Sequence, residues 1–199
     1  SANCLPQPHA VIVKTDFSLK GLNTFGIAAR ARDYVSVATT QELISFLTES
    51  ELKHNLKLVL GGGSNMLLTQ DVVGTVLHIN LRGKKVVAET STHTIIEAGA
   101  GENWHEVVLW ALLHNLGGIE NLSLIPGNIG TAPVQNIGAY GVELKDTFHS
   151  LDAVAIATGK ERTFTLEECQ FGYRDSIFKN EAKGKYIITA VRLQLKKPP

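Results

Sequence analysis

The sequence is poor in cysteine, carries no excess charge and contains no long apolar run. Its two cysteines, Cys4 and Cys169, lie far apart in no Cys-x-x-Cys or Cys/His pattern, which excludes a disulfide framework and a structural zinc site. The longest wholly apolar run, residues 107–113, is far shorter than the roughly 20 residues that span a bilayer. Lys plus Arg and Asp plus Glu number 19 each, so we expect neither nucleic acid nor a membrane as a partner.

Signals and common catalytic motifs are also missing. Residues 1–4 resemble no secretory signal, and with the sparse cysteines this favours a cytoplasmic location. The seven histidines are scattered, so a metal site is not expected. No Gly-x-Ser-x-Gly supports a hydrolase, and the absence of a P-loop and of Gly-x-Gly-x-x-Gly between a strand and a helix disfavours P-loop and Rossmann nucleotide sites.

What is present is the composition of a globular protein, with 199 residues of which 44% are apolar. Residues 33–65 read as strand, helix, strand and glycine loop, and a capping box of Thr39 and Glu42 predicts a helix that ends near Lys53. Consecutive strands follow over 75–98. This order indicates an α/β or α+β fold with a lobe boundary just after the glycine loop. The last strand, 186–195, is predicted to carry one apolar face: Ile187, Val191, Leu193 and Leu195.

Nine of the 18 glycines lie in two segments, three at 61–63 and six within 117–141. Glycine lets main-chain amides approach an anion closely, so a cofactor that carries phosphate is one interpretation. Ser64 and Asn65 could donate hydrogen bonds to the same phosphate. Tight turns without a ligand are the alternative.

The stretch 125–141 is long, irregular and rich in small and polar residues. Its many backbone donors and acceptors need partners, which a large cofactor could supply. A plain surface loop is the alternative, but it does not explain the four apolar residues of the stretch: Ile125, Ile129, Val134 and Ile137.

Arg174 is embedded among aromatic and apolar residues at 171–178. An arginine in this setting could bind a substrate carboxylate with two hydrogen bonds. The alternative is a structural ion pair with Asp175 or another carboxylate. Tyr173 by default is a packed aromatic, and Cys169 is expected to be a small buried apolar residue.

Five motifs together resemble a known family. They are Asn-Thr-Phe-Gly-Ile at 23–27, Leu-Gly-Gly-Gly-Ser-Asn at 60–65, Ala-Gly-Ala-Gly-Glu-Asn-Trp at 98–104, the stretch 125–141, and residues 169–179. In this order they are similar to the UDP-N-acetylenolpyruvoylglucosamine reductases, also called UDP-N-acetylmuramate dehydrogenases. The resemblance implies an α+β, two-lobed FAD-binding fold of the vanillyl-alcohol-oxidase (PCMH) type. It also implies an N-terminal extension at 1–22, a first FAD-binding lobe at 23–70 and a second at 71–199.

The resemblance also implies a reaction and its cofactors. NADPH would reduce FAD, and the reduced flavin would reduce UDP-N-acetylenolpyruvoylglucosamine to UDP-N-acetylmuramate in peptidoglycan precursor synthesis, with no obligate protein partner. Arg174 matches the family's catalytic arginine, which binds the substrate carboxylate and stabilises the developing negative charge. Tyr173 would help to shape the same pocket.

By the same resemblance, the loop 61–65 would wrap the pyrophosphate, Gln135 and Asn136 would lie near the isoalloxazine, and Ile188 would pack close to the ring. The full set of expected cofactor-binding residues is Gly61, Gly62, Gly63, Ser64, Asn65, Met66, Leu67, Ile125, Pro126, Gly127, Gly130, Thr131, Ala132, Gln135, Asn136, Gly138, Ala139, Tyr140, Gly141 and Ile188.

One departure from the family leaves alternatives open. Family members continue into a substrate-binding domain with a serine proton donor and a glutamate, which Ser64, Ser123 and Ser176 do not match. We therefore expect the FAD-binding part of the enzyme, catalytically incomplete by itself. The alternatives are a non-catalytic flavin-binding module and another flavoprotein oxidase of this fold. Arg174 and Tyr173 favour the reductase, and 125–141 contains no His or Cys for covalent flavin attachment.

Overall fold

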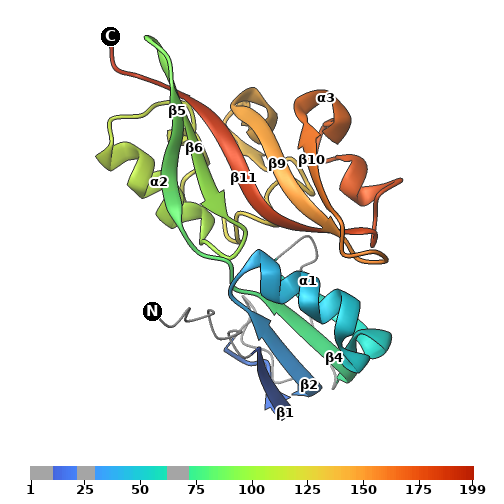
Figure 1. The fold of residues 1–199 in the computed structure, drawn as a ribbon. Coiled ribbons are helices and arrows are strands. Elements are labelled where there is room, and N and C mark those ends of the chain that lie inside the picture. Colours follow the sequence, from blue (N-terminus) through green and yellow to red (C-terminus); the bar gives the residue numbers. More distant parts are fainter. Residues whose placement is uncertain (1–10, 22–29, 62–71) are drawn as a thin grey trace, which may run out of the picture.

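Two β-sheets, joined by a short crossing of the chain, organise the protein. The structure is a computed structural model that describes residues 11–21, 30–61 and 72–199. The smaller sheet and one helix form the lower lobe in Figure 1, and the larger sheet with the other helices forms the upper lobe. No helix within the described residues is long and apolar enough to cross a membrane.

The smaller sheet has the strand order β1-β2-β4-β3. Its strands are β1 (Ile12–Ser18), β2 (Arg30–Val37), β3 (Leu56–Leu60) and β4 (Val72–Ile79). β2 and β3 both run parallel to β4, while β1 pairs antiparallel with β2. Helix α1 (Thr40–Glu49) and a 3-10 turn (Glu51–Asn55) make the crossover that parallel strands require.

Helix α1 begins where its capping box predicts. Thr39 Oγ1 accepts a hydrogen bond from the Glu42 N–H at 3.1 Å, and the Glu42 carboxylate accepts one from the Thr39 N–H at 3.2 Å. The helix ends at Glu49, before the expected end near Lys53, because Ser50 is extended and its side chain caps the following 3-10 turn. The buried face of α1 consists of Leu43, Phe46 and Leu47.

The larger sheet is antiparallel, with the strand order β10-β9-β11-β6-β5. Its strands are β5 (Lys84–Glu89), β6 (His93–Gly99), β9 (Phe148–Ala155), β10 (Glu161–Thr165) and β11 (Tyr186–Lys196). The same lobe contains two helices and a short hairpin. They are helix α2 (Trp104–Leu113), the hairpin of β7 (Gly138–Ala139) and β8 (Val142–Glu143), and helix α3 (Leu166–Cys169). Three more 3-10 turns lie at Glu120–Leu122, Leu144–Asp146 and Ile177–Lys179.

Strand β11 contributes to two apolar cores. We expected Ile187 on the same face as Val191, and this is wrong: Ile187 packs with α1 in the core between the lobes, whereas Ile188 packs with Val191 in the core of the larger lobe. A β-bulge shifts the pairing with β9 just before Ala190. The extra residue moves the alternation of side chains by one position, so one strand supplies both cores.

The pairing of strands also moves the expected lobe boundary. Residues 71–199 were expected to form the second lobe and 1–22 an extension, yet β4 lies between β2 and β3 in the smaller sheet, and β1 is its edge strand. β4 is buried from both sides, with Val76 in the core on one face and Leu77 in the core on the other. The chain therefore passes to the larger sheet after β4, at residues 80–83.

A hydrogen bond from the buried indole of Trp104 joins the 117–125 region to α2. Its Nε1–H donates to the Leu122 carbonyl at 2.8 Å. Trp104→Phe leaves that buried carbonyl without its donor, so we expect the free energy of unfolding to fall by about 1–3 kcal/mol. Urea unfolding followed by far-UV circular dichroism measures this.

Trp110→Phe is the matched control, because Trp110 is only partly buried against the same core. We expect a loss below about 1 kcal/mol for this control. Equal losses in the two variants would show that the Trp104 hydrogen bond contributes nothing specific.

Candidate functional site

Gly61, at the end of β3, meets the 125–141 stretch. Its backbone has φ +86°, and a Cβ added there would lie 3.1 Å from the Ile79 carbonyl oxygen and 3.3 Å from Asn128 Nδ2. Only glycine suits both this φ and this space. The rest of the predicted loop, Gly62, Gly63, Ser64, Asn65, Met66 and Leu67, lies outside the described residues, as does the motif at 23–27.

The motif at 98–104 is bonded through its main chain to the start of 125–141. The Gly130 N–H donates to the Ala100 carbonyl at 3.0 Å, and the Ile129 N–H donates to the Glu102 carbonyl at 2.9 Å. The Trp104 N–H donates to the carbonyl of Gly127, whose φ is +116°. The motifs around Gly61, 98–104 and 125–130, distant in the sequence, therefore form one junction between the lobes.

Asn136 fixes the other half of the 125–141 stretch. Its side chain is fully buried, and Nδ2 donates to Glu143 Oε2 and to the Gly172 carbonyl, both at 2.8 Å. Its Oδ1 accepts from the Lys145 N–H at 3.0 Å. All of these bonds stay within the protein, so the amide holds the loop in place, whereas the neighbouring Gln135 is exposed.

Arg174 lies against the same loop. Its Nη2 donates to the Gly138 carbonyl at 2.7 Å, and Nη1 lies 3.5 Å from the Asn136 carbonyl oxygen. A Cβ on Gly138 would come within 2.6 Å of Nη1, so this approach requires glycine. The backbone of Arg174 itself takes φ +49°, which is uncommon for a residue with a side chain.

The alternative pairing of Arg174 with Asp175 is absent. The Asp175 carboxylate instead accepts two hydrogen bonds from Asn180 Nδ2, at 3.0 and 3.1 Å. Among the described residues, no carboxylate forms an ion pair with Arg174, whose guanidinium lies 5.1 Å from the centroid of the Tyr173 ring. Carbonyl dipoles thus orient the guanidinium, and no carboxylate in the described part of the chain pairs with it.

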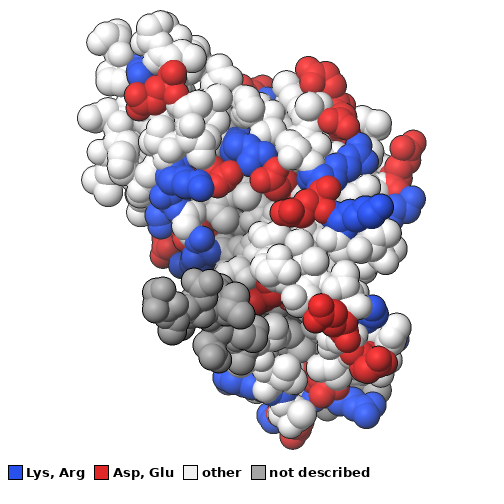
Figure 2. Space-filling model, viewed as in Figure 1, with Lys and Arg blue, Asp and Glu red and all other residues white. Residues whose placement is uncertain are grey.

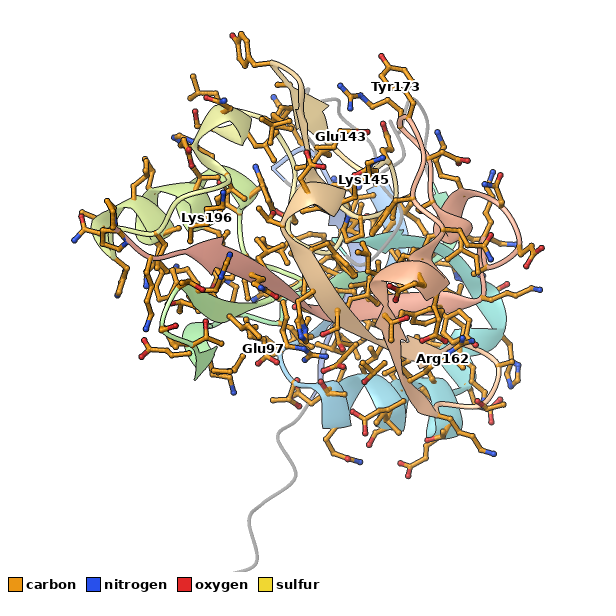
Figure 3. The ribbon with its side chains drawn as sticks, turned by 90° about the horizontal axis from the view of Figure 1, so that it is seen from above. Glu97, Glu143, Lys145, Arg162, Tyr173 and Lys196 are labelled. Atoms are coloured by element: carbon orange, nitrogen blue, oxygen red, sulfur yellow. The ribbon has the colours of Figure 1, made fainter. Side chains whose placement is uncertain are left out.

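The remaining predicted residues fall into three groups. Tyr173 and Tyr140 are exposed, at 83% and 90%. Ile188 is fully buried in the core of the larger lobe. The others lie along the loop, with Gly130 and Ala132 buried, Ile125, Gly127, Thr131, Gly138 and Ala139 half-buried, and Pro126 and Gly141 exposed. Figure 3 shows Tyr173 and Glu143 on one side of the molecule and Glu97 and Arg162 on the opposite side.

Glu102 is a polar residue of the junction that we did not single out from the sequence. Its side chain is only 5% exposed, and its carboxylate accepts from the Gly83 N–H at 2.7 Å and faces Arg82 Nε at 3.4 Å and Lys84 Nζ at 3.3 Å. Burial alone raises the pKa of Glu102, but the Gly83 N–H and the two cations outweigh it and hold the pKa below its ordinary value. The sequence feature that could have pointed to Glu102 is a carboxylate next to the glycines at 99 and 101.

A cleft of about 330 Å³ opens between the lobes, and none of the predicted site residues that the structure describes lines it. It is lined by the start of α1, residues 81–85, Glu97, Gly99, Thr189 and Ala190. Figure 2 shows positive and negative side chains interspersed over the larger sheet beside it. Here the Arg192 guanidinium is paired with Asp152 and Glu97, at 2.6 and 2.8 Å, so its charge is neutralised, whereas Arg174 has no such partner within residues 11–21, 30–61 and 72–199.

Cys169 is buried, as expected. Burial raises the pKa of its thiol to about 12, and the negative charge of Glu168 adds to the shift. The thiol is therefore neutral at physiological pH, which disfavours a role as a nucleophile.

The fold and the sequence are both similar to those of known proteins. The fold resembles that of p-cresol methylhydroxylase with substrate bound, at 13% identity and a TM-score of 0.56 over 87% of this chain and 37% of that one. A sequence profile described as FAD binding domain matches residues 31–165. The chain belongs to this FAD binding domain family, and the expected two-lobed α+β fold of the vanillyl-alcohol-oxidase type is confirmed.

Two proteins similar to this chain are named as reductases of one kind. The chain is 53% identical over 185 residues to a protein of Flavobacterium johnsoniae named UDP-N-acetylenolpyruvoylglucosamine reductase, covering 93% of this chain and 54% of the relative. A crystal structure of UDP-N-acetylenolpyruvylglucosamine reductase from Thermus caldophilus is 26% identical with a TM-score of 0.72, over 96% of this chain and 64% of that one. The chain therefore spans about half the length of the curated relatives it matches.

The free energy of unfolding is expected to depend on the ionisation of Glu102, whose pKa is lowered. Because its pKa is lower in the folded state, ionised Glu102 stabilises the fold at neutral pH, and this contribution is lost as the pH falls from about 5 towards 3. Glu102→Gln should lower the free energy of unfolding at pH 7 by roughly 1–3 kcal/mol, and by less at pH 3. Urea titrations at both pH values measure the difference.

Glu181→Gln is the control, because Glu181 is exposed. We expect it to change the free energy of unfolding by less than about 0.5 kcal/mol at either pH. A loss in Glu102→Gln that is the same at pH 7 and pH 3 would contradict a role for the ionised carboxylate.

Proposed function

We propose that this chain forms the flavin-binding part of an NADPH-dependent oxidoreductase that converts UDP-N-acetylenolpyruvoylglucosamine to UDP-N-acetylmuramate. The reaction belongs to peptidoglycan precursor synthesis for the bacterial cell wall, and we place it in the cytoplasm. The similarity to named reductases supports the proposal, and Arg174 is the observation that carries it. A guanidinium that lies beside the 125–141 loop, and that no described carboxylate pairs with, suits a substrate with a carboxylate next to its double bond.

The described residues fit a flavin dinucleotide. Gly61 and Gly127 have positive φ and meet other loops where a side chain would not fit or would be strained, so main-chain amides can face a phosphate. We propose that residues 61–67 and 125–141 hold the cofactor, with the smaller lobe ending after β4. When bound, FAD supplies the redox chemistry: hydride acceptance from NADPH and hydride donation to the enolpyruvyl double bond.

The contribution of this chain's own residues is positioning and charge. Arg174 would bind the substrate carboxylate and stabilise the negative charge that spreads onto it during hydride addition. Its two carbonyl partners, in Gly138 and Asn136, fix the guanidinium in advance, so little reorganisation is needed when that charge develops. Tyr173, stacked near the guanidinium, would restrict its movement.

The rest of the catalytic groups are proposed to lie in the half of the relatives that this chain does not span. There, a serine would protonate the intermediate and a glutamate would assist. We therefore expect this chain to bind FAD and to show no turnover with NADPH and substrate alone. Turnover by the chain alone would overturn that part of the proposal.

Flavin binding is tested by a visible absorption spectrum of the chain after incubation with FAD and desalting. We expect retained flavin bands and a higher melting temperature with FAD, since a ligand that binds only the folded state stabilises it. Gly61→Ala should retain markedly less flavin, because its Cβ would press on the Ile79 carbonyl and the Asn128 amide.

Gly184→Ala is the matched control, since Gly184 has φ +72° but open space around a Cβ. Both substitutions impose the same backbone strain, and only the first touches the junction. Equal flavin retention in the two variants would contradict the role of the Gly61 loop.

Substrate binding is tested by titrating the flavin-loaded chain with UDP-N-acetylenolpyruvoylglucosamine and following the flavin spectrum. Arg174→Met should weaken the Kd by about tenfold or more, because a charged hydrogen bond to the carboxylate is lost. Arg174→Lys keeps the charge without the two-pronged geometry and should fall between.

Arg162→Met serves as the control, because Arg162 is an exposed arginine over the Phe164 ring and lies on the side of the molecule opposite Tyr173 in Figure 3. It should leave both flavin retention and substrate affinity unchanged. Full substrate affinity in Arg174→Met would contradict the proposed role of Arg174 in binding the substrate carboxylate.

A further inference from the structure

Residues 80–83 carry the chain from the smaller sheet to the larger one. At the start of this crossing segment, the Asn80 N–H donates to the Val37 carbonyl of β2 at 2.9 Å. Further along, the Leu81 and Gly83 carbonyls accept from the Gly101 and Gly99 N–H groups, at 2.8 and 3.0 Å. The crossing segment is thus bonded to the smaller lobe at one end and to residues 99–102 of the larger lobe at the other.

The contact between the crossing segment and residues 99–102 is main chain against main chain. A Cβ on Gly99 would lie 2.4 Å from the Leu81 carbonyl oxygen, and one on Gly101 would lie 2.8 Å from the Leu81 nitrogen. No side chain can therefore separate the two segments. Their relative position depends on the hydrogen bonds and charges at this contact.

Glu102 is the charged group at the contact. Its buried carboxylate accepts from the Gly83 N–H and faces Arg82 and Lys84, all three of which lie at the crossing segment or directly after it. Arg82 also donates from Nη1 to the Gly101 carbonyl at 3.3 Å. Three groups of one segment thus converge on a single carboxylate.

The main chain of Glu102 is bonded to a different segment, the 127–130 loop. Its carbonyl accepts from the Ile129 N–H at 2.9 Å, next to the Gly130 to Ala100 hydrogen bond. Asn128, just before Ile129, is the residue whose amide lies against Gly61. One residue therefore links the crossing segment through its side chain to the 127–130 loop through its backbone.

We propose that Glu102 is a positioning residue for the flavin site: its carboxylate clamps the crossing segment to residues 99–102 and so sets the 127–130 loop against Gly61. The inference rests on the proposed function, since the 127–130 loop and Gly61 belong to the segments proposed to hold FAD. Glu102 does not contact the cofactor in this proposal; it acts through the loop.

Glu97 shows what a merely structural glutamate of the same strand region looks like. It pairs with Arg192 at 2.8 Å and with Lys85 at 3.4 Å, so it also faces two cations. Its side chain lies on the side of the molecule opposite Tyr173, as Figure 3 shows. Glu97 thus matches Glu102 in charge and ion pairing, but, unlike Glu102, it forms no main-chain hydrogen bond to the 127–130 loop.

The experiment compares Glu102→Gln with Glu97→Gln in the full 199-residue chain. The Kd for FAD is measured by quenching of flavin fluorescence, and the melting temperature is measured without FAD. We expect Glu102→Gln to weaken the FAD Kd by about tenfold, the loss of one charged hydrogen bond, and Glu97→Gln to change it by less than about twofold. Both should lower the melting temperature of the FAD-free chain.

Lys84→Met provides a second, milder variant should Glu102→Gln fail to fold, since it removes one of the two cations and leaves the Gly83 hydrogen bond. It should weaken the FAD Kd in the same direction by a smaller factor. An unchanged Kd in a folded Glu102→Gln chain, or an equal weakening in Glu97→Gln, would overturn the inference alone. A wild-type chain that binds no FAD would overturn the proposed function as well.

Discussion

The main-chain contact between residues 80–83 and 99–102 is the constraint on which the rest of the structure depends. It holds two sheets of different construction against each other, one mixed and one antiparallel, and it exists only because Gly99 and Gly101 lack side chains. The 127–130 loop is bonded onto residues 99–102 and meets Gly61. Each predicted loop of the junction therefore takes its position from this one contact.

An apolar core that includes Leu81 and Ala100 reinforces the contact. Val154 and Ile187 of the larger sheet pack with the buried face of α1 and with β2 and β4 of the smaller sheet. The bulge in β11 makes this possible, because it turns Ile187 towards α1 while Ile188 stays in the core of the larger lobe. The lobes are thus joined by apolar packing as well as by hydrogen bonds, which suits a site assembled from both.

Two arginines illustrate how the same side chain takes different roles. Arg192 lies on an outer sheet face and is paired with Asp152 and Glu97, so its charge is compensated within the protein. Arg174 is held by carbonyl oxygens and has no carboxylate partner among the described residues. A carbonyl dipole orients a guanidinium without cancelling its charge, and the charge can therefore act on an anionic ligand.

Local features of the sequence predicted local features of the structure. The capping box of Thr39 and Glu42 opens α1, and the irregularity of 125–141 is found as expected, since both depend on neighbouring residues and on glycine. The resemblance of five motifs to those of a known family pointed to that family, because the order of motifs along the chain reflects the whole fold. The periodicity of apolar residues alone could not predict that β4 pairs within the smaller sheet or that a bulge turns Ile187 to the other core. Nor could it predict that the Asn136 side chain forms its hydrogen bonds with other groups of the protein.

The sequence by itself therefore determined where α1 begins, that 125–141 is irregular, and which family the motifs resemble. Only the tertiary structure decided which segments meet: Gly61 with Asn128, Arg174 with Gly138, and Glu102 with Gly83. The physical reason is that caps, turns and alternation act over a few residues, whereas these contacts join residues 19 to 67 positions apart and depend on the packing of whole sheets.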